Sequence, residues 1–427
     1  MIVAIIAGFF LFALLGVPLA FSLGLASLAG MLVSGFDLVQ MPGKMVHAVD
    51  SFPLMAIPLF IIAGQLMVRG GIMDPLIDFA NAIVGRVQGG LAHVTIVAAM
   101  GLSAISGVAV ADAAALGGTL GPHLSRVYSR PFAASLVAAA SCLGPIIPPS
   151  GAMIVYAVVA SDVSVAALFM AGIVPGIIMG IGMMVLSSVI ARRRNYPVSG
   201  EPFSFARVFQ TFRRAGLIFG MPIVVIGGII AGAFTATEAA AIAVVYAIAI
   251  GFLVTRRLKL SDLPPALLSA GILTSVVGAL IAFSATVTYL LTLERVGDLV
   301  ASWMLAFTSD PTVFLLLVMA IVLVLGMFME GNTIIIMFAP IVAPLAIAFK
   351  IDPVFFGLLF VINVVLGSIT PPVGILLFVT ASIWQLDLPS IVKEVFPFIF
   401  LLYGILLVLV FFPSLSMALP WALGYGQ

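Results

Sequence analysis

The chain has 427 residues, of which 63% are hydrophobic and only 8% are charged, and its formal net charge is +1. A soluble domain carries roughly a quarter charged residues and about half apolar ones, so this composition excludes a protein whose surface faces water, and the charge indicates no nucleic-acid partner. The single cysteine, Cys142, excludes a disulfide framework and a cysteine-based metal cluster.

Long segments without a charged side chain recur along the whole chain. A helix needs roughly 20 apolar residues to cross about 30 Å of hydrocarbon. Together with shorter apolar runs, these segments predict roughly ten to thirteen membrane segments. The runs are continuous rather than alternating, which predicts helices and not a β-barrel. The long segments are 1–36, 131–161, 163–191, 215–237, 263–293, 353–386 and 395–427.

The first interruption of this apolar pattern lies between residues 103 and 112. It separates two apolar arms, 91–105 and 113–121, each too short to cross a bilayer, so we predict a re-entrant hairpin with its tip near Ser106. Asp112 is a functional candidate because burying an acid in a membrane is expensive. The alternative for Ser106 is a hydrogen bond to a carbonyl of its own helix.

Next along the chain, a Pro-Pro motif stands near the middle of an apolar segment, at 144–151. Two adjacent prolines break a helix, and unwound backbone at mid-membrane depth must line a cavity or pack against protein. Free carbonyls and hydroxyls suit Na⁺, whereas the N-terminus of the following half-helix suits a carboxylate. The alternative is a kink that only shapes packing.

A basic stretch, 192–214, divides the chain, and a second basic loop contains Arg256, Arg257 and Lys259. Between them Glu238 is the only charged residue, and the length allows two spans. Both basic segments can therefore face the cytoplasm, as the positive-inside bias favours. We expect Thr235 or Thr237 to cap the second of these helices, with Glu238 in a structural role.

The second half of the chain repeats the features of the first. Glu330 to Thr333 separates apolar runs 311–329 and 334–349, which predicts a second hairpin, and Glu330 either accepts N–H groups at its tip or binds an ion. The pattern G-x-I-x-P-P-x-G recurs 223 residues after Gly144, at Gly367. We therefore predict two repeat halves, 1–191 and 215–427, as in many secondary transporters.

Several stretches together resemble the large membrane subunit of tripartite ATP-independent periplasmic (TRAP) transporters. They cover most of the chain and are residues 51–60, 106–118, 144–156, 234–246 and 370–378. The resemblance implies an all-α elevator-type transporter of the bacterial inner membrane, with two hairpins and two broken helices. It implies sodium-driven uptake of a dicarboxylate, sialic acid or another organic acid. The expected partners are a periplasmic binding protein and a small four-helix membrane subunit, which we do not expect as a fused part of this chain.

Combining both arguments gives the predicted sites, with Na⁺ as the coupling ion and no other cofactor. The first sodium site is predicted at Ser106, Gly144, Ile147 and Pro149, and the second at Gly331, Asn332, Thr333, Gly367, Thr370 and Pro372. The substrate is expected between the two tips, at Ser106, Asp112, Ser150, Glu330 and Thr370.

Three other functions remain as alternatives. A stand-alone sodium/anion symporter of related duplicated fold would need no binding protein, and a passive channel would not accumulate its solute. A membrane hydrolase would rest on residues 101–104, which resemble an intramembrane serine-protease motif, with His93 or His123 as the base. No further catalytic constellation supports it, so we expect no enzyme.

Overall fold

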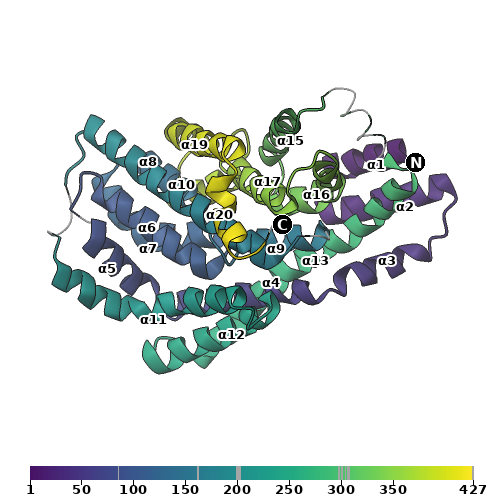
Figure 1. Ribbon diagram of the computed structural model, residues 1–427. Coiled ribbons are helices and arrows are strands. Elements are labelled where there is room, and N and C mark those ends of the chain that lie inside the picture. Colours follow the sequence, from purple (N-terminus) through teal and green to yellow (C-terminus); the bar gives the residue numbers. More distant parts are fainter. Residues whose placement is uncertain are drawn as a thin grey trace.

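The computed structural model describes residues 1–84, 86–160, 163–198, 203–296 and 308–425, together with residues 299, 302 and 304. This described part is all-α and contains no β-strand (Figure 1). Seven of its helices are long and apolar enough to cross a membrane. The shorter apolar helices α1, α2, α6, α15, α17 and α18 account for the other predicted apolar segments. The predicted all-α polytopic architecture is therefore confirmed.

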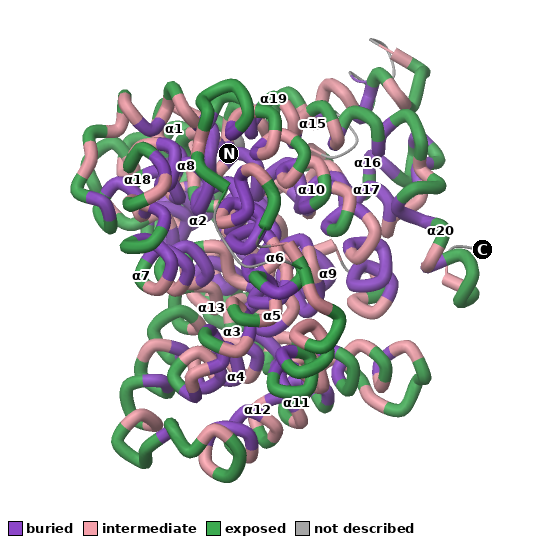
Figure 2. Tube along the Cα trace, turned by 90° about the vertical axis from the view of Figure 1, so that its left-hand side faces the viewer, coloured by how far each residue is buried: buried purple, intermediate pink, exposed green. Residues whose placement is uncertain are grey.

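One group of helices, called the frame here, packs around α4 and α13. Helix α4 contacts α12 and α13, and α13 also contacts α2 and α3. Helices α3, α4, α11 and α12 line the lower edge in both views (Figure 1, Figure 2). The frame consists of α1 (Ile2–Leu14), α2 (Leu19–Ser34), α3 (Gln40–Val49), η1 (Phe52–Met55), α4 (Ala56–Arg69), α11 (Phe205–Ile230), α12 (Ala236–Ala249), η2 (Ile250–Val254), η3 (Leu260–Asp262) and α13 (Leu263–Leu293).

The remaining helices form two hairpins, two interrupted helices and the long helices beside them. Helix α5 links this group to the frame, because it packs against both α6 and α11. The elements are α5 (Met73–Val84), α6 (Gly90–Ser106), α7 (Ala109–Val127), α8 (Arg130–Ser141), α9 (Gly151–Val159), α10 (Val165–Arg193), α15 (Pro311–Gly326), α16 (Gly331–Ala348), α17 (Pro353–Gly367), α18 (Ile375–Trp384), α19 (Leu388–Phe411) and α20 (Ser414–Ala422).

Both Pro-Pro motifs interrupt a helix. Helix α8 ends at Ser141 and α9 begins at Gly151, while α17 ends at Gly367 and α18 begins at Ile375. The Pro148–Pro149 and Pro371–Pro372 peptide bonds are cis. The two interruptions interleave, since α9 packs against α16 and α17, whereas α18 packs against α7 and α8. The unwound segments are therefore enclosed by protein, as backbone at membrane depth requires.

Two predicted boundaries were wrong by a few residues. The second arm of the first hairpin begins at Ala109 rather than 113, so Asp112 lies in the first turn of α7 and not in the tip. Gly107 adopts the left-handed conformation (φ +64°) that lets the chain reverse within two residues. Helix α11 is already helical from Phe205, so the connection predicted at 192–214 is shorter, and residues 199–202 lie outside the described part.

Helix α12 begins with a capping box. The Thr235 hydroxyl accepts the Glu238 N–H at 3.3 Å, and the Glu238 carboxylate accepts the Thr235 N–H at 2.8 Å. Glu238 is exposed. This confirms the structural role predicted for Glu238 and assigns the cap to Thr235 rather than Thr237.

Candidate functional site

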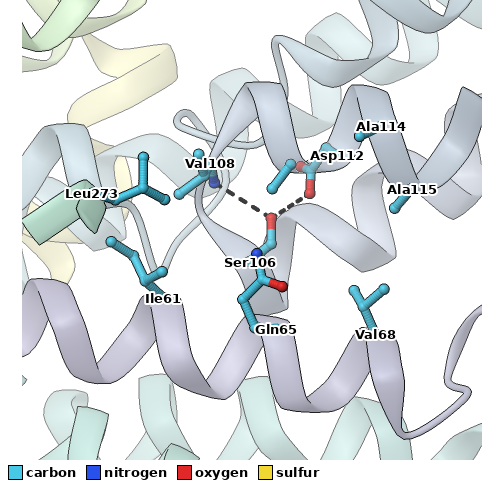
Figure 3. A pocket seen from close by; sticks show the side chains of 11 residues that line it. Ile61, Gln65, Val68, Ser106, Val108, Asp112, Ala114, Ala115 and Leu273 are labelled. Carbon is cyan, nitrogen blue, oxygen red and sulfur yellow. Dashed lines mark hydrogen bonds between the residues drawn. The ribbon is translucent and has the colours of Figure 1, made fainter. Parts of the chain in front are cut away.

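A buried carboxylate lies beside the tip of the first hairpin, in the first turn of α7. Asp112 is 0% exposed and accepts hydrogen bonds from the hydroxyls of Ser106 and, at 3.4 Å, Ser103. The Val108 N–H donates to the Ser106 Oγ at 3.3 Å, so Ser106 joins the tip backbone to the acid (Figure 3). Ser106 therefore bonds to Asp112 and not to a carbonyl of its own helix.

The unwound segment after α8 lies against this carboxylate. A Cβ atom on Gly144 would stand 2.6 Å from the Asp112 Oδ2 and 3.2 Å from the Ser141 carbonyl oxygen, so only glycine leaves room here. A Cβ atom on Gly107 would collide with the Pro149 carbonyl oxygen. The fold thus brings together the end of α6 at Ser106, the start of α7 at Asp112, and the unwound segment that contains Gly144 and Pro149.

The groups around Asp112 are oxygen ligands of the kind that hard cations prefer. They are a carboxylate, the hydroxyls of Ser103 and Ser106, and carbonyls of an interrupted helix end. Within the described residues no Lys, Arg or His forms an ion pair with Asp112; the ion pairs found there are Arg194–Glu394 and Arg257–Asp74. The described part also lacks a cluster of three His, Cys, Asp or Glu residues suited to a transition metal. This donor set fits Na⁺.

A cavity of about 220 Å³ opens beside the acid, between the hairpin and the frame helices α4 and α13. Its polar lining is Gln65, Ser106 and Asp112, and Figure 3 shows the Gln65 side chain rising from α4 towards Ser106. The apolar lining residues are Ile61, Val68, Val108, Ala111, Ala114, Ala115 and Leu273.

The tip of the second hairpin is arranged differently. Glu330 is the N-cap of α16, and its carboxylate accepts the Thr333 N–H at 3.1 Å and the Asn332 side-chain N–H at 3.0 Å. Of the two roles considered for Glu330, the structure shows the capping one. Residues Asn332 and Thr333 bond to this cap and not to the second unwound segment.

The contact between the second hairpin and its unwound segment is made by Gly326 and Met327. The Met327 carbonyl accepts the N–H groups of Val373 at 3.2 Å and Gly374 at 3.4 Å. A Cβ atom on Gly326 would lie 2.8 Å from the Gly367 Cα, so the two backbones touch. Gly331 instead faces Val364, which a Cβ atom would approach to 3.0 Å. The structure thus places Gly331 against α17 one turn before Gly367, and the sodium site predicted at 331–333 and Gly367 stays a prediction.

Two predicted hydroxyl ligands are engaged within their own segments. Ser150 caps α9 by accepting the Met153 N–H at 3.2 Å and donates to the Pro145 carbonyl at 2.5 Å. Thr370 donates to the Leu366 carbonyl at 2.8 Å, one turn back. Ile147 donates its N–H to the Leu143 carbonyl at 2.8 Å, which continues the last turn of α8.

The serine-hydrolase alternative with His93 as the base fails on geometry. Ser103 donates to Asp112, while the His93 Nε2 lies 2.9 Å from both the Met184 carbonyl and the Ser188 Oγ, on α10. His93 therefore cannot serve Ser103 as a base in this arrangement.

Residues 6–415 of the chain match the family described as "Tripartite ATP-independent periplasmic transporter, DctM component". Over 94% of both chains it is 38% identical to the C4-dicarboxylate TRAP transporter large permease protein DctM of Pseudomonas aeruginosa. The sialic acid TRAP transporter large permease protein SiaM of Vibrio cholerae is 34% identical, with 96% of this chain and 97% of SiaM covered.

The 2,3-diketo-L-gulonate TRAP transporter large permease protein YiaN of Escherichia coli is 35% identical, with 95% of this chain and 96% of YiaN covered. Among solved structures, the YdaH transporter of Alcanivorax borkumensis has a similar fold, with a TM-score of 0.63, 17% identity and coverage of 91% and 89%. These relatives are transporters and not enzymes. This multi-pass inner-membrane chain belongs to the DctM family and is a large permease subunit of the tripartite ATP-independent periplasmic transporters.

Proposed function

We propose that this permease couples the uptake of a small organic acid to the entry of Na⁺. The observation that carries the proposal is the buried Asp112 carboxylate, which lies between two serine hydroxyls and the unwound backbone at Gly144. A carboxylate without a cation is costly in a membrane, and a sodium ion bound by these oxygens would remove that cost. The second proposed sodium site remains at the unwound segment 367–374.

The same charge argument gives a physical reason for coupling. An ionised Asp112 at the cavity wall repels an anionic substrate, and the repulsion between charges is strong where water is excluded. Binding of Na⁺ neutralises the charge of the Asp112 carboxylate, so the ion must bind before the acid or together with it. C4-dicarboxylates, sialic acid and 2,3-diketo-L-gulonate are the substrates named for the relatives, and they define the class proposed here.

The proposed transport step is a movement of the hairpins and interrupted helices as one body against the frame. Support comes from the interleaving of α9 and α18 with helices of the opposite half, which ties both unwound segments into one unit. The proposed partners are a small membrane subunit and a periplasmic binding protein. The isethionate permease named DctMQ supports the small membrane subunit as a partner. This chain covers only 65% of that relative, whose name joins a second component to DctM.

The first test of this function is the substitution Asp112→Asn. We expect it to abolish sodium-dependent uptake, because the amide lacks the negative charge that attracts the ion. The assay is uptake of labelled succinate, sialic acid or 2,3-diketo-L-gulonate into proteoliposomes. These contain this chain and its small subunit, with the binding protein outside and an imposed sodium gradient.

The control for this test is Asp387→Asn, which alters an exposed acid that caps α19 outside the site. It should transport like the wild type. Sodium-dependent uptake that persists in the Asp112 variant would contradict the proposed site. Uptake by the wild type without the binding protein would instead indicate a stand-alone symporter.

A further inference from the structure

One polar side chain that lines the cavity beside Asp112 comes from the frame and not from the hairpin. It is Gln65, in an otherwise apolar stretch of helix α4, and the Gln65 carboxamide points into the cavity towards Ser106 (Figure 3). Gln65 is half-buried and forms no hydrogen bond with any described residue. The two N–H donors and the oxygen of this carboxamide thus have no partner among the described residues, so its position in the cavity wall requires an explanation.

The position of Gln65 is fixed by close packing and not by its own polar contacts. A Cβ atom on the preceding residue, Gly64, would lie 3.0 Å from the Ser106 Cα, so α4 touches the hairpin tip at this point. This approach holds the carboxamide at the entrance of the tip. Packing thus places an unpaired amide beside the acid and its serine hydroxyl.

Apart from Gln65, the side-chain donor that lines the cavity is already in use. The Ser106 hydroxyl donates its hydrogen bond to Asp112, and the Val108 N–H donates to the Ser106 Oγ. The carboxylate of Asp112 offers only acceptors when ionised. Among the lining side chains, the Gln65 carboxamide therefore keeps the only free N–H donors, two of them. The apolar remainder of the lining suits the hydrocarbon part of a small acid.

We propose that the carboxamide of Gln65 binds a carboxylate of the transported acid, so that the bound acid bridges the hairpin tip to frame helix α4. This rests on the proposed function and names the contact by which the acid is recognised. The cavity, at about 220 Å³, lies below the range of roughly 300–1,000 Å³ that holds drug-sized ligands, which favours a small acid of the dicarboxylate type. Sodium at Asp112 and the amide at Gln65 then act on the same substrate from opposite sides.

The test measures acid binding directly, without the binding protein, because that protein would otherwise set the apparent affinity. The purified complex of this chain with its small subunit is held at saturating Na⁺. Its thermal stability is followed against the concentration of succinate, sialic acid or 2,3-diketo-L-gulonate. Gln65→Leu, which keeps the size and removes the donors, should raise the half-saturating acid concentration at least tenfold. Gln65→Glu should raise it further, because it adds a negative charge opposite the substrate.

Two controls separate recognition from a loss of structure. Gln210→Leu makes the same substitution at an exposed position of α11 that does not line the cavity, and it should leave the half-saturating concentration unchanged. Stabilisation by Na⁺ alone should be the same in all variants, since Asp112 is intact. Asn at position 65, one methylene shorter, should recover part of the lost affinity.

The outcomes for this contact and for the transport function are distinguishable. Equal half-saturating concentrations in the wild type and Gln65→Leu would overturn the contact while leaving sodium-coupled transport in place. If an acid stabilises the wild type but no sodium-dependent uptake is found, the transport function is overturned. The half-saturating acid concentrations of the wild type and Gln65→Leu still decide whether Gln65 binds the acid. A wild type that no acid stabilises would overturn the proposed contact.

Discussion

Gly144 shows how much a single residue decides in this site. Its Cα lies against the carboxylate of Asp112, and an added Cβ atom would stand 2.6 Å from the Oδ2. Real Cβ atoms do not approach an oxygen so closely, so the carboxylate would have to leave its position beside Ser106. The geometry of the oxygen ligands therefore depends on the absence of one methyl group.

We predict that Gly144→Ala weakens the coupling to sodium with the fold retained. The sodium concentration for half-maximal uptake should rise at least tenfold, which corresponds to about 1.4 kcal/mol of lost binding free energy. The matched variant is Gly118→Ala on α7 of the same hairpin, where an added Cβ atom meets no other heavy atom within 4 Å. That variant should behave like the wild type, and an equal sodium response in both variants would argue against a site at Gly144.

At the scale of elements, α16 shows how the frame holds a hairpin. Pro340 lies inside this helix and has no N–H, so the Ile336 carbonyl loses its partner within the helix. The Ser284 hydroxyl of α13 donates to that carbonyl at 3.0 Å, in a buried position. A proline in the hairpin and a serine in the frame are thus coupled across the boundary between the two groups.

This coupling predicts a non-additive pair of substitutions. Ser284→Ala should lower the free energy of unfolding by about 0.5–1.5 kcal/mol, because it leaves a buried carbonyl unpaired. In a Pro340→Ala background, where the helix regains its own N–H donor, the same substitution should cost much less. A double-mutant cycle on the purified protein, unfolded in detergent by a denaturant, measures the difference. Additive costs would show that the proline and the serine act independently.

At the scale of the whole molecule, the basic residues set the orientation in the membrane. The ends of α10 and η2 carry the two basic segments, near Arg193 and Arg257, and α11 and α12 lie between them as a pair of spans. We therefore expect both segments to face the cytoplasm, as the positive-inside bias favours. Helix α13 crosses once more, so we expect Glu294, at its C-terminal end, on the opposite side.

Cysteine labelling checks this orientation. The native Cys142 is 1% exposed and should not react with the reagent, so the wild type serves as the unlabelled control. Phe205→Cys, at a position 83% exposed, should react with a membrane-impermeant maleimide only when the cytoplasmic face is open to the reagent. Glu294→Cys, also exposed, should react from the other face in intact cells. Labelling of both positions from the same face would show that the orientation is wrong.

Much of the architecture follows from local chemistry alone. Scarce charges require a membrane, Pro-Pro pairs interrupt helices at 142–150 and 368–374, and Thr235 with Glu238 forms a helix cap from four neighbouring residues. These are effects of neighbours in the chain, so they can be recognised in sequence. Boundaries were less accurate where a single glycine, Gly107, reverses the chain in two residues.

The composition of the site was decided by the tertiary structure. Hydroxyls look alike in sequence, and only folding shows that Ser106 faces Asp112 while Ser150 and Thr370 bond within their own segments. Gln65 was missed because the residues that share its cavity, such as Ser106 and Asp112, lie far along the chain; the available signal was a lone amide in an apolar helix. The sequence by itself determined a helical membrane protein with interrupted helices, since solvent and backbone chemistry act locally. Only the packing of distant helices decided which oxygen atoms and amides meet, because that depends on glycine contacts such as Gly64 with Ser106 and Gly326 with Gly367.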